Sequence, residues 1–188
     1  TVRCFGGLDI LVLNAGTFPT GKLIEDLDIE TWGKSIEINL NSQQRILRTC
    51  IPILKEGIDP AVVFIASRNV PAPGPGAAAY SVPKSGQTHL ARIAALELGQ
   101  FVIRVNVLHT DCVFDTGLWT SEALERSAGR YGLTVEEYKS RNILKTDVKA
   151  REVATTTAAF GTKPVFLHLI LKNFSAPKSA PNPASVTT

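Results

Sequence analysis

Short apolar runs alternate with longer helical patterns along this chain. Residues 8–16, 60–67 and 101–109 each contain a run rich in Val, Ile and Leu. In the first two the apolar part is continuous, which is typical of strands buried on both faces, as in a parallel sheet. We therefore expect three strands at these places.

The stretch 26–57 has the pattern of a long helix. Asp28 is placed to cap its first turn, and Gly57 is placed to end it. Asn39 and Asn41 lie in the middle of the pattern, where Asn is a poor helix former. We therefore expect a kink at these two residues.

A second long helix is predicted over 80–99. Pro83 falls in its first turns, where the missing N–H costs least. One face of this helix is apolar and is expected to pack against the sheet. That face consists of Leu90, Ile93, Ala94 and Leu98.

Two further helical regions follow the third strand. Residues 120–142 are expected to form helical pieces around a break at Gly129 and Gly132, and 148–160 a further helix. The order strand, long helix, strand, long helix, strand indicates an α/β fold. Right-handed crossovers then give a parallel sheet covered on both faces.

The pattern predicts one domain over 1–172. Residues 173–188 are rich in Pro, Ser and Thr and contain no acid, so we expect a disordered tail. With 188 residues, of which 44% are hydrophobic and 20% charged, the chain can bury a sizeable core.

Charge and hydropathy argue against two classes of partner. The net charge is only +3, and Lys and Arg are spread along the chain, so a nucleic-acid surface is not expected. No apolar run approaches the roughly 20 residues that a membrane-spanning helix needs. We therefore expect neither nucleic acid nor a membrane as a partner.

Cysteine and histidine usage argues against metal and disulfide chemistry. Cys4, Cys50 and Cys112 are odd in number and far apart, so neither a zinc site nor a disulfide framework is expected. The three histidines do not have metal-ligand spacing either. Such cysteines fit a reduced, cytoplasmic compartment.

Three residues suggest catalysis. Tyr80 and Lys84 are four positions apart and project from one helix face, and a Pro- and Gly-rich corner could bring Ser67 beside them. A phenol has a pKa of roughly 10, which a neighbouring ammonium lowers. Ser67 would hold a substrate oxygen while Tyr80 exchanges a proton with it. This chemistry suits alcohol–carbonyl interconversion, with a cofactor handling the hydride.

A structural interpretation remains open for each residue taken alone. Tyr and Lys at this spacing are common on amphipathic helices, and a Ser at a strand end is unremarkable. However, ligands of open α/β sheets bind outside the carboxyl ends of the strands. Three motifs lie there, at 14–16, at Ser67 and after Leu108, and this coincidence favours catalysis.

Four motifs together resemble a known family. They are Ser67 with Tyr80-x-x-x-Lys84, "LNAG" with Leu13 in place of an Asn, "EINL", and "IRVNVL". They are similar to those of the classical short-chain dehydrogenases/reductases, and the resemblance covers about residues 5–160. Within the family, "IASRNVPAPGPGAAAYSVPKSGQTHLAR" and "DCVFDTGLW" most resemble the dehydrogenase half of bifunctional rhamnulose-1-phosphate aldolase/alcohol (lactaldehyde) dehydrogenases.

The resemblance implies a doubly wound, Rossmann-like parallel sheet and a role for each site residue. Tyr80 is the general acid/base, Lys84 lowers its pKa and holds the nicotinamide ribose, and Ser67 positions the substrate oxygen. Asn39 completes the catalytic tetrad and holds a water that connects Lys84 to solvent. The implied cofactor is NAD or NADP, with NAD favoured, and no metal is implied. The implied cofactor contacts are Asn14, Ala15, Gly16, Tyr80, Lys84, Asp111 and Val113.

The sequence departs from the family pattern in three places. No Gly-rich turn precedes a helix, so the N-terminal βαβ part that binds pyrophosphate is expected to be missing and the chain to be a fragment that binds NAD weakly. Thr110 and Asp111 stand where the family has Pro-Gly. The similarity fades after about Phe160, although 165–171 could form a final strand.

Three functional interpretations remain. The first is a fragment of an NAD(P)-dependent dehydrogenase acting on a small alcohol or a sugar-derived hydroxyl, expected to form homo-oligomers through helices 40–56 and 80–98. The second is a non-catalytic oligomerising subunit or pseudo-enzyme of the same fold. The third is an epimerase or dehydratase. Phe114 and Trp119 either line the substrate pocket or pack in the core.

Overall fold

The computed structural model describes residues 1–162. In chain order its elements are α1 (Val2–Phe5), β1 (Ile10–Leu13), α2 (Ile29–Ile36), α3 (Ser42–Leu54), β2 (Ala61–Ile65), α4 (Ala78–Leu98), β3 (Arg104–Leu108), α5 (Ser121–Gly129), α6 (Val135–Lys139) and α7 (Ala150–Thr162). The helical pieces predicted over 120–142 are α5 and α6. The final strand predicted at 165–171 and the tail at 173–188 lie outside the described residues.

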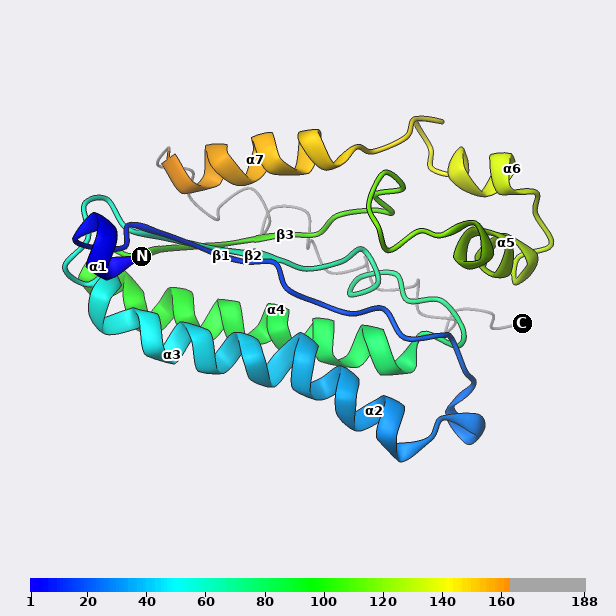
Figure 1. Ribbon diagram of the computed structural model, residues 1–188, viewed down its shortest axis with the longest axis horizontal. Coiled ribbons are helices and arrows are strands. Elements are labelled where there is room, and N and C mark those ends of the chain that lie inside the picture. The colour runs from blue at the N-terminus through cyan, green and yellow to red at the C-terminus, as the bar shows by residue number, and fades with distance from the viewer. Residues whose placement is uncertain (163–188) are drawn as a thin grey trace, which may run out of the picture.

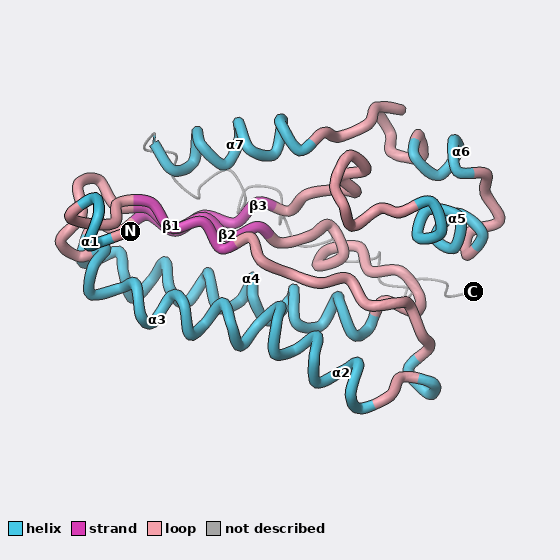
Figure 2. The backbone as a smooth tube through the Cα atoms, viewed as in Figure 1, coloured by secondary structure: helices cyan, strands magenta, loops and turns pink. Residues whose placement is uncertain are grey.

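The three strands form one parallel sheet in the order β1-β2-β3 (Figure 2). Leu13 of β1 lies opposite Phe64 of β2, and Phe64 lies opposite Val107 of β3. All three strands therefore end at the same edge, and the predicted α/β fold with a parallel sheet is confirmed.

Helices cover the two faces of the sheet unequally (Figure 1). α2, α3 and α4 lie on one side, α7 lies on the other, and α5 and α6 lie beyond the carboxyl ends of the strands. The core fills the space between the sheet and helices α3 and α4, where Leu54, Val62 and Phe64 are completely buried. Full burial of one such side chain contributes about 1.5–3 kcal/mol. This packed core therefore holds the sheet against α3 and α4.

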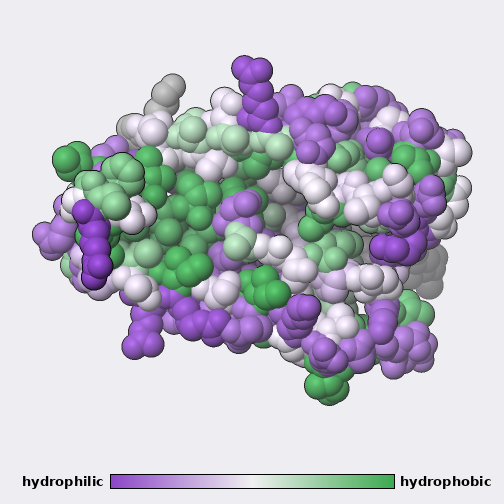
Figure 3. Space-filling model, in the orientation of Figure 1, coloured by the Kyte–Doolittle hydropathy of each residue, from purple (hydrophilic) through white to green (hydrophobic). Residues whose placement is uncertain are grey.

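The prediction that the first strand is buried on both faces is wrong. Leu13 is buried against α3 and α4, but Ile10 is 38% and Val12 44% exposed on the opposite face. α7 packs more closely over β2 than over β1, and in the described part β1 has a neighbour on one side only. The apolar area in the left half of Figure 3 lies over this strand.

The buried stripe of α4 also differs from the predicted one. Ala94 and Leu98 are buried as expected, but Ile93 is 41% exposed. The stripe runs toward the start of the helix through Lys84 and Gln87, which are 3% and 0% exposed. Hydropathy could not identify it, because four of the nine buried residues of α4 are polar.

The first long helical pattern contains a change of helix type. Asp28 caps α2 as predicted, since its side chain accepts a hydrogen bond of 2.7 Å from the Thr31 N–H. A π-helical turn at Glu37–Asn41 then joins α2 to α3. The change of helix type therefore includes Asn39 and Asn41, where a kink was predicted. The helix ends before Gly57, at Leu54.

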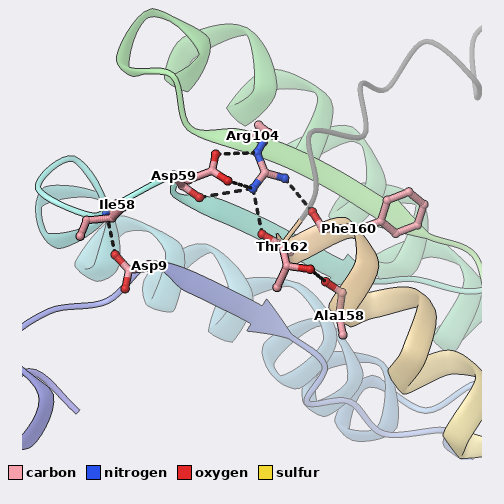
Figure 4. A network of polar contacts seen from close by, with 8 residues as sticks. Asp9, Ile58, Asp59, Arg104, Ala158, Phe160 and Thr162 are labelled. Atoms are coloured by element: carbon pink, nitrogen blue, oxygen red, sulfur yellow. Dashed lines mark hydrogen bonds and ion pairs between the residues drawn. The ribbon is translucent and has the colours of Figure 1, made fainter.

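Arg104 ties the start of β3 to the end of α7 (Figure 4). Its guanidinium donates hydrogen bonds of 2.8 Å to the Phe160 and Gly161 carbonyls and pairs with Asp59 at 3.3 Å. The last carbonyls of a helix have no partner within the helix, and a cation there also complements the helix dipole. This contact fixes one end of α7 against the sheet.

Candidate active site

One cavity of about 880 Å³ lies at the carboxyl ends of the strands. It is bounded by the segments that follow β1, β2 and β3, by the start of α4, and by residues of α5, α6 and the loops next to them. It also extends along the exposed face of β1, where Ile10 and Val12 face α7. Eight of the nine predicted site residues line it: Asn14, Ala15, Gly16, Ser67, Tyr80, Lys84, Asp111 and Val113. Asn39 is fully buried behind the cavity wall.

Asn39 holds the loop that follows β1. Its side-chain oxygen accepts from the Thr17 N–H, and its amide group donates to the Thr17 carbonyl, both at 3.0 Å. The same amide donates to the Ser35 hydroxyl at 2.9 Å, so no side-chain N–H is left for a water. The role that the structure gives to this side chain is to position the loop, and the predicted water contact is untested.

Gln43 provides a second anchor for the same loop. One turn beyond Asn39, its amide donates a 2.7 Å hydrogen bond to the Ala15 carbonyl, and the residue is fully buried. The π-helical turn fixes the rotation of α3 relative to α2. In this arrangement the side-chain amides of Asn39 and Gln43 both face the loop after β1. Asn14, Ala15 and Gly16 thus present their backbone to the cavity on a fixed support.

Gly16 occupies a position without room for a side chain. A Cβ atom built there would lie 2.9 Å from the Asn39 oxygen and 3.6 Å from Lys84 Nζ. The first distance is too short for an ordinary contact, and Asn39 is held by three hydrogen bonds. The close approach brings together the loop, Lys84 and Asn39.

Lys84 is a buried amine that reaches back to the sheet. Its Nζ donates to the Ile65 carbonyl at 2.8 Å and to Gln87 Oε1 at 3.1 Å. Burial penalises the ammonium form and lowers the pKa of Lys84 to about 8. An ammonium has three donors, so these two bonds leave one N–H for the cavity.

Tyr80 is the second titratable group of the site. Lys84 Nζ lies 5.9 Å from the centre of its ring. The sequence predicted a lowered phenol pKa, but burial raises the pKa of Tyr80, and hydrogen bonding to the adjacent Ser67 hydroxyl opposes this only in part. Desolvation by burial is the largest cause of the shift, which corrects the predicted direction.

Asp111 braces the rim of the cavity. Its carboxylate pairs with Arg68 Nε at 2.6 Å and accepts from the Cys112 N–H at 2.8 Å. His109 supports the same region, because its Nδ1 lies 3.0 Å from the Ser67 carbonyl. These contacts join the segment after β2 to the segment after β3, whereas the predicted contact of Asp111 with a cofactor is untested.

An aromatic wall continues the cavity beyond Tyr80. The Phe18 ring lies 4.6 Å from the Tyr80 ring and 6.4 Å from Trp119, and Trp119 lies 6.1 Å from Tyr138. Trp119 lines the cavity. Phe114 packs behind it, at 5.0 Å from Trp119 and 6.0 Å from Tyr138. Of the two interpretations left open by the sequence, lining of the pocket applies to Trp119 and packing against other side chains applies to Phe114.

Sequence reasoning missed several residues that shape the site: Ser35, Gln43, Gln87, Phe18 and Tyr138. Gln43 and Gln87 gave a usable signal, because each is a polar residue in the buried stripe of a helix next to a predicted site residue. Phe18 and Tyr138 gave none, because they come from segments without a regular pattern.

Neither a metal centre nor a membrane span is evident in residues 1–162. No group of three His, Cys, Asp or Glu side chains there lies close enough to hold a metal ion. No helix in that range is long and apolar enough to cross a bilayer.

Comparison with known proteins places these features in a family. A family model described as enoyl-(acyl carrier protein) reductase matches residues 1–162. The uncharacterized oxidoreductase YuxG of Bacillus subtilis is 30% identical over 84% of this chain and 24% of its own length. Human dehydrogenase/reductase SDR family member 4 is 32% identical over 67% of this chain and 46% of its own length. The chain thus spans half or less of the length of these curated relatives.

The fold has close counterparts among solved structures. The crystal structure of carveol dehydrogenase from Mycobacterium avium in complex with NAD has a TM-score of 0.77, at 23% identity, and covers 85% of this chain and 60% of that one. Together with the family model and the curated relatives, the parallel sheet and the Ser67, Tyr80 and Lys84 constellation lead to one assignment. The chain belongs to the short-chain dehydrogenase/reductase family.

Proposed function

We propose that the protein containing this chain is an NAD(P)-dependent oxidoreductase that interconverts a small alcohol and its carbonyl compound, with Tyr80 as the general acid/base. The observation that carries the proposal is that Ser67, just after β2, lines one cavity together with Tyr80 and Lys84 of α4. NAD is favoured over NADP, in keeping with the NAD that the carveol dehydrogenase structure holds.

The cavity residues fit a nicotinamide cofactor. Asn14, Ala15 and Gly16 are exposed and line the cavity, and Gly16 gives a flat surface beside Lys84 Nζ. Lys84 and Tyr80 would hold the ribose, and Val113 and Asp111 lie further along the same wall. When bound, the cofactor supplies or accepts the hydride.

The proton is handled by side chains of this chain. Burial raises the pKa of Tyr80, so at neutral pH the phenol is protonated and can donate to a carbonyl oxygen during reduction. Ser67 lies beside the phenol and would hold the same oxygen as negative charge develops on it. In the oxidation direction the alcohol proton passes to a Tyr80 phenolate, which the Lys84 ammonium stabilises.

We also propose three finer assignments. The parent protein is a bifunctional rhamnulose-1-phosphate aldolase/alcohol dehydrogenase, which is supported by the motifs at 65–92 and 111–119. The match to this chain covers only 24% of YuxG, so that relative is long enough to hold a further domain. It is cytoplasmic, in keeping with three free cysteines. It forms homo-oligomers through helices 40–56 and 80–98, which expose apolar side chains.

The test is kinetic and uses the full-length parent protein with NAD and 1,2-propanediol. Tyr80→Phe keeps the ring but removes the hydroxyl, so kcat should fall by about 10²–10⁴-fold while NAD affinity stays nearly constant. Ser67→Ala should lower kcat less, since the proton donor remains. Ser85→Ala, which removes an exposed hydroxyl from the same helix, is the matched control.

Near-normal turnover by Tyr80→Phe would disprove the role of Tyr80. If the wild-type parent protein turns over none of a panel of small alcohols and carbonyl compounds, the non-catalytic alternative is favoured instead.

A further inference from the structure

The charged side chains around the cavity are strongly unbalanced. Four of them are basic: Arg68, Lys84, Arg130 and Arg141. Asp111 is the one acidic residue that lines the cavity, and it pairs with Arg68 at 2.6 Å. Charged groups in a partly desolvated cavity interact more strongly than in water, so the cavity favours an anion.

Arg130 and Arg141 have no role in the chemistry described above. Lys84 is proposed to stabilise the Tyr80 phenolate, and Arg68 pairs with Asp111. Arg130 and Arg141 make no ion pair within the described residues, although both line the cavity. Arg141 is half-buried, where a purely structural guanidinium is usually paired with an acid, whereas Arg130 is exposed and needs no such partner.

Arg141 is held in a fixed orientation by two aromatic rings. Its guanidinium carbon lies 4.3 Å from the centre of the Tyr138 ring and 4.7 Å from that of Tyr131. Stacking of this kind occupies the flat face of the guanidinium and leaves the N–H groups at its edge free. Tyr138 is only 5% exposed and is therefore the well-packed ring of the pair, since Tyr131 is 42% exposed.

Arg130 and Tyr131 each lie against a glycine of a neighbouring loop. A Cβ atom on Gly21 would lie 2.6 Å from the guanidinium of Arg130, and one on Gly74 would lie 2.5 Å from the Tyr131 hydroxyl. The residues that follow α5 therefore pack closely against the loops at 17–23 and 71–77, where glycine leaves room for their side chains.

The ring on which Arg141 stacks belongs to the same aromatic wall as the proton donor. The Phe18 ring lies 4.6 Å from the Tyr80 ring and 6.4 Å from Trp119, and Trp119 lies 6.1 Å from the Tyr138 ring. Two aromatic side chains of the cavity wall therefore connect Tyr80 with the ring on which Arg141 stacks. A substrate whose oxygen meets Tyr80 can extend past Cys112 and Trp119 toward Arg141.

We propose that the substrate carries an oxyanion, a carboxylate or a phosphate, which Arg141 and Arg130 bind at the end of the cavity away from Tyr80. The guanidinium fork matches the two oxygens of either group. This inference rests on the proposed function, which supplies the reacting end of the substrate. It assigns Arg141 and Arg130 as specificity-determining residues.

The test measures binding rather than turnover. Trp32→Phe leaves Trp119 in the cavity wall as the single tryptophan, because the chain has two, and excitation at the red edge of the absorption band selects it over the three tyrosines. Its fluorescence is titrated with 3-hydroxybutanoate against the neutral 3-hydroxybutanamide, and with glycerol 3-phosphate against glycerol. At least one anion should bind about 10-fold to 100-fold more tightly than its neutral partner, and the tighter anion identifies the group.

Matched variants assign the preference to the two arginines. Arg141→Gln and Arg130→Gln should each weaken the anion about 10-fold or more and leave the neutral partner unaffected. Arg141→Lys should retain part of the preference, because it keeps the charge without the fork. Arg126→Gln, which neutralises an exposed arginine of α5, should retain all of it.

Several results would overturn the proposal. They are equal binding of anion and neutral partner, a preference that persists when both arginines are replaced, and the absence of saturable binding by either anion. The proposed function fails separately, because a Tyr80→Phe protein with normal turnover would contradict it while leaving the anion preference in place.

Discussion

Lys84 combines nearly complete burial with a titratable amine. It is 3% exposed, and its hydrogen bonds go to a backbone carbonyl and to a neutral amide rather than to a carboxylate. No acidic group therefore offsets the loss of hydration, which is the reason its pKa falls to about 8. Such an amine is poised to gain or lose its charge within the ordinary working range of an enzyme.

This amine makes stability depend on pH in a defined window. The pKa of Lys84 is about 8 in the folded protein, against an ordinary lysine pKa of 10.5, so between these values the unfolded chain binds more protons. The free energy of unfolding therefore rises with pH across this window. Below it the full penalty of the buried charge is present, and above it the penalty is absent.

Urea unfolding of the wild type and of Lys84→Met, from about pH 7 to about pH 10, would measure the effect. The stability of the wild type should rise relative to that of the variant as pH increases. A constant difference would mean that this amine titrates alike in both states.

At the scale of elements, α7 depends on one cation at its end. Arg104 donates to two of the last carbonyls of this helix, and its side chain is 11% exposed. Arg104→Gln shortens the side chain and removes the charge, so buried carbonyls lose their partner. We expect a loss of about 1–3 kcal/mol in the free energy of unfolding.

The measurement is urea unfolding together with amide hydrogen exchange in α7, which should lose protection. Arg151→Gln, on the exposed side of α7, is the control and should change neither. Equal effects of the two variants would show that the contact in Figure 4 does not hold the helix.

Local patterns were sufficient to predict most elements from the sequence. Continuous apolar runs located the strands, and Asp28 marked the start of α2 because its cap is formed by residues three apart. The exposure of Ile10 and Val12 could not be predicted, since it depends on where α7 packs. That packing is set by residues distant in the sequence, and no local pattern encodes it.

The same distinction applies to the site. Ser67, Tyr80 and Lys84 were predictable because their spacing alone brings them to one edge of the sheet. The rise in the pKa of Tyr80 was not, because it depends on how deeply the folded protein buries the phenol. The stacking of Arg141 on Tyr138 was not predictable either, since it depends on the conformation of irregular segments.

At the scale of the whole molecule, apolar side chains remain on two outer surfaces. One is the face of β1 that exposes Ile10 and Val12. The other lies on α3 and α4, where Ile46 is 41% and Leu96 83% exposed. Exposed apolar clusters of this kind mark contact surfaces, and the proposed homo-oligomer uses the second.

Two charge substitutions distinguish these surfaces. Leu96→Lys should reduce the sedimentation mass of the protein toward that of a monomer, because a charge would be buried in the proposed interface. Val12→Lys, on the other face of the molecule, should leave the mass unchanged. The reverse result would show that copies associate through the sheet instead of the helices.

The π-helical turn at Glu37–Asn41 has a consequence for how this gene can change. A π-helical turn contains one more residue than an α-helical one, so deletion of a single codon there would let α2 and α3 join as one regular helix. Every residue before the deletion would then rotate by about 100° relative to α3. Ser35, which donates a 2.5 Å hydrogen bond to the Ala79 carbonyl of α4, would leave its partner. The shortest in-frame deletion is therefore expected to be among the most harmful, although it would leave a better helix.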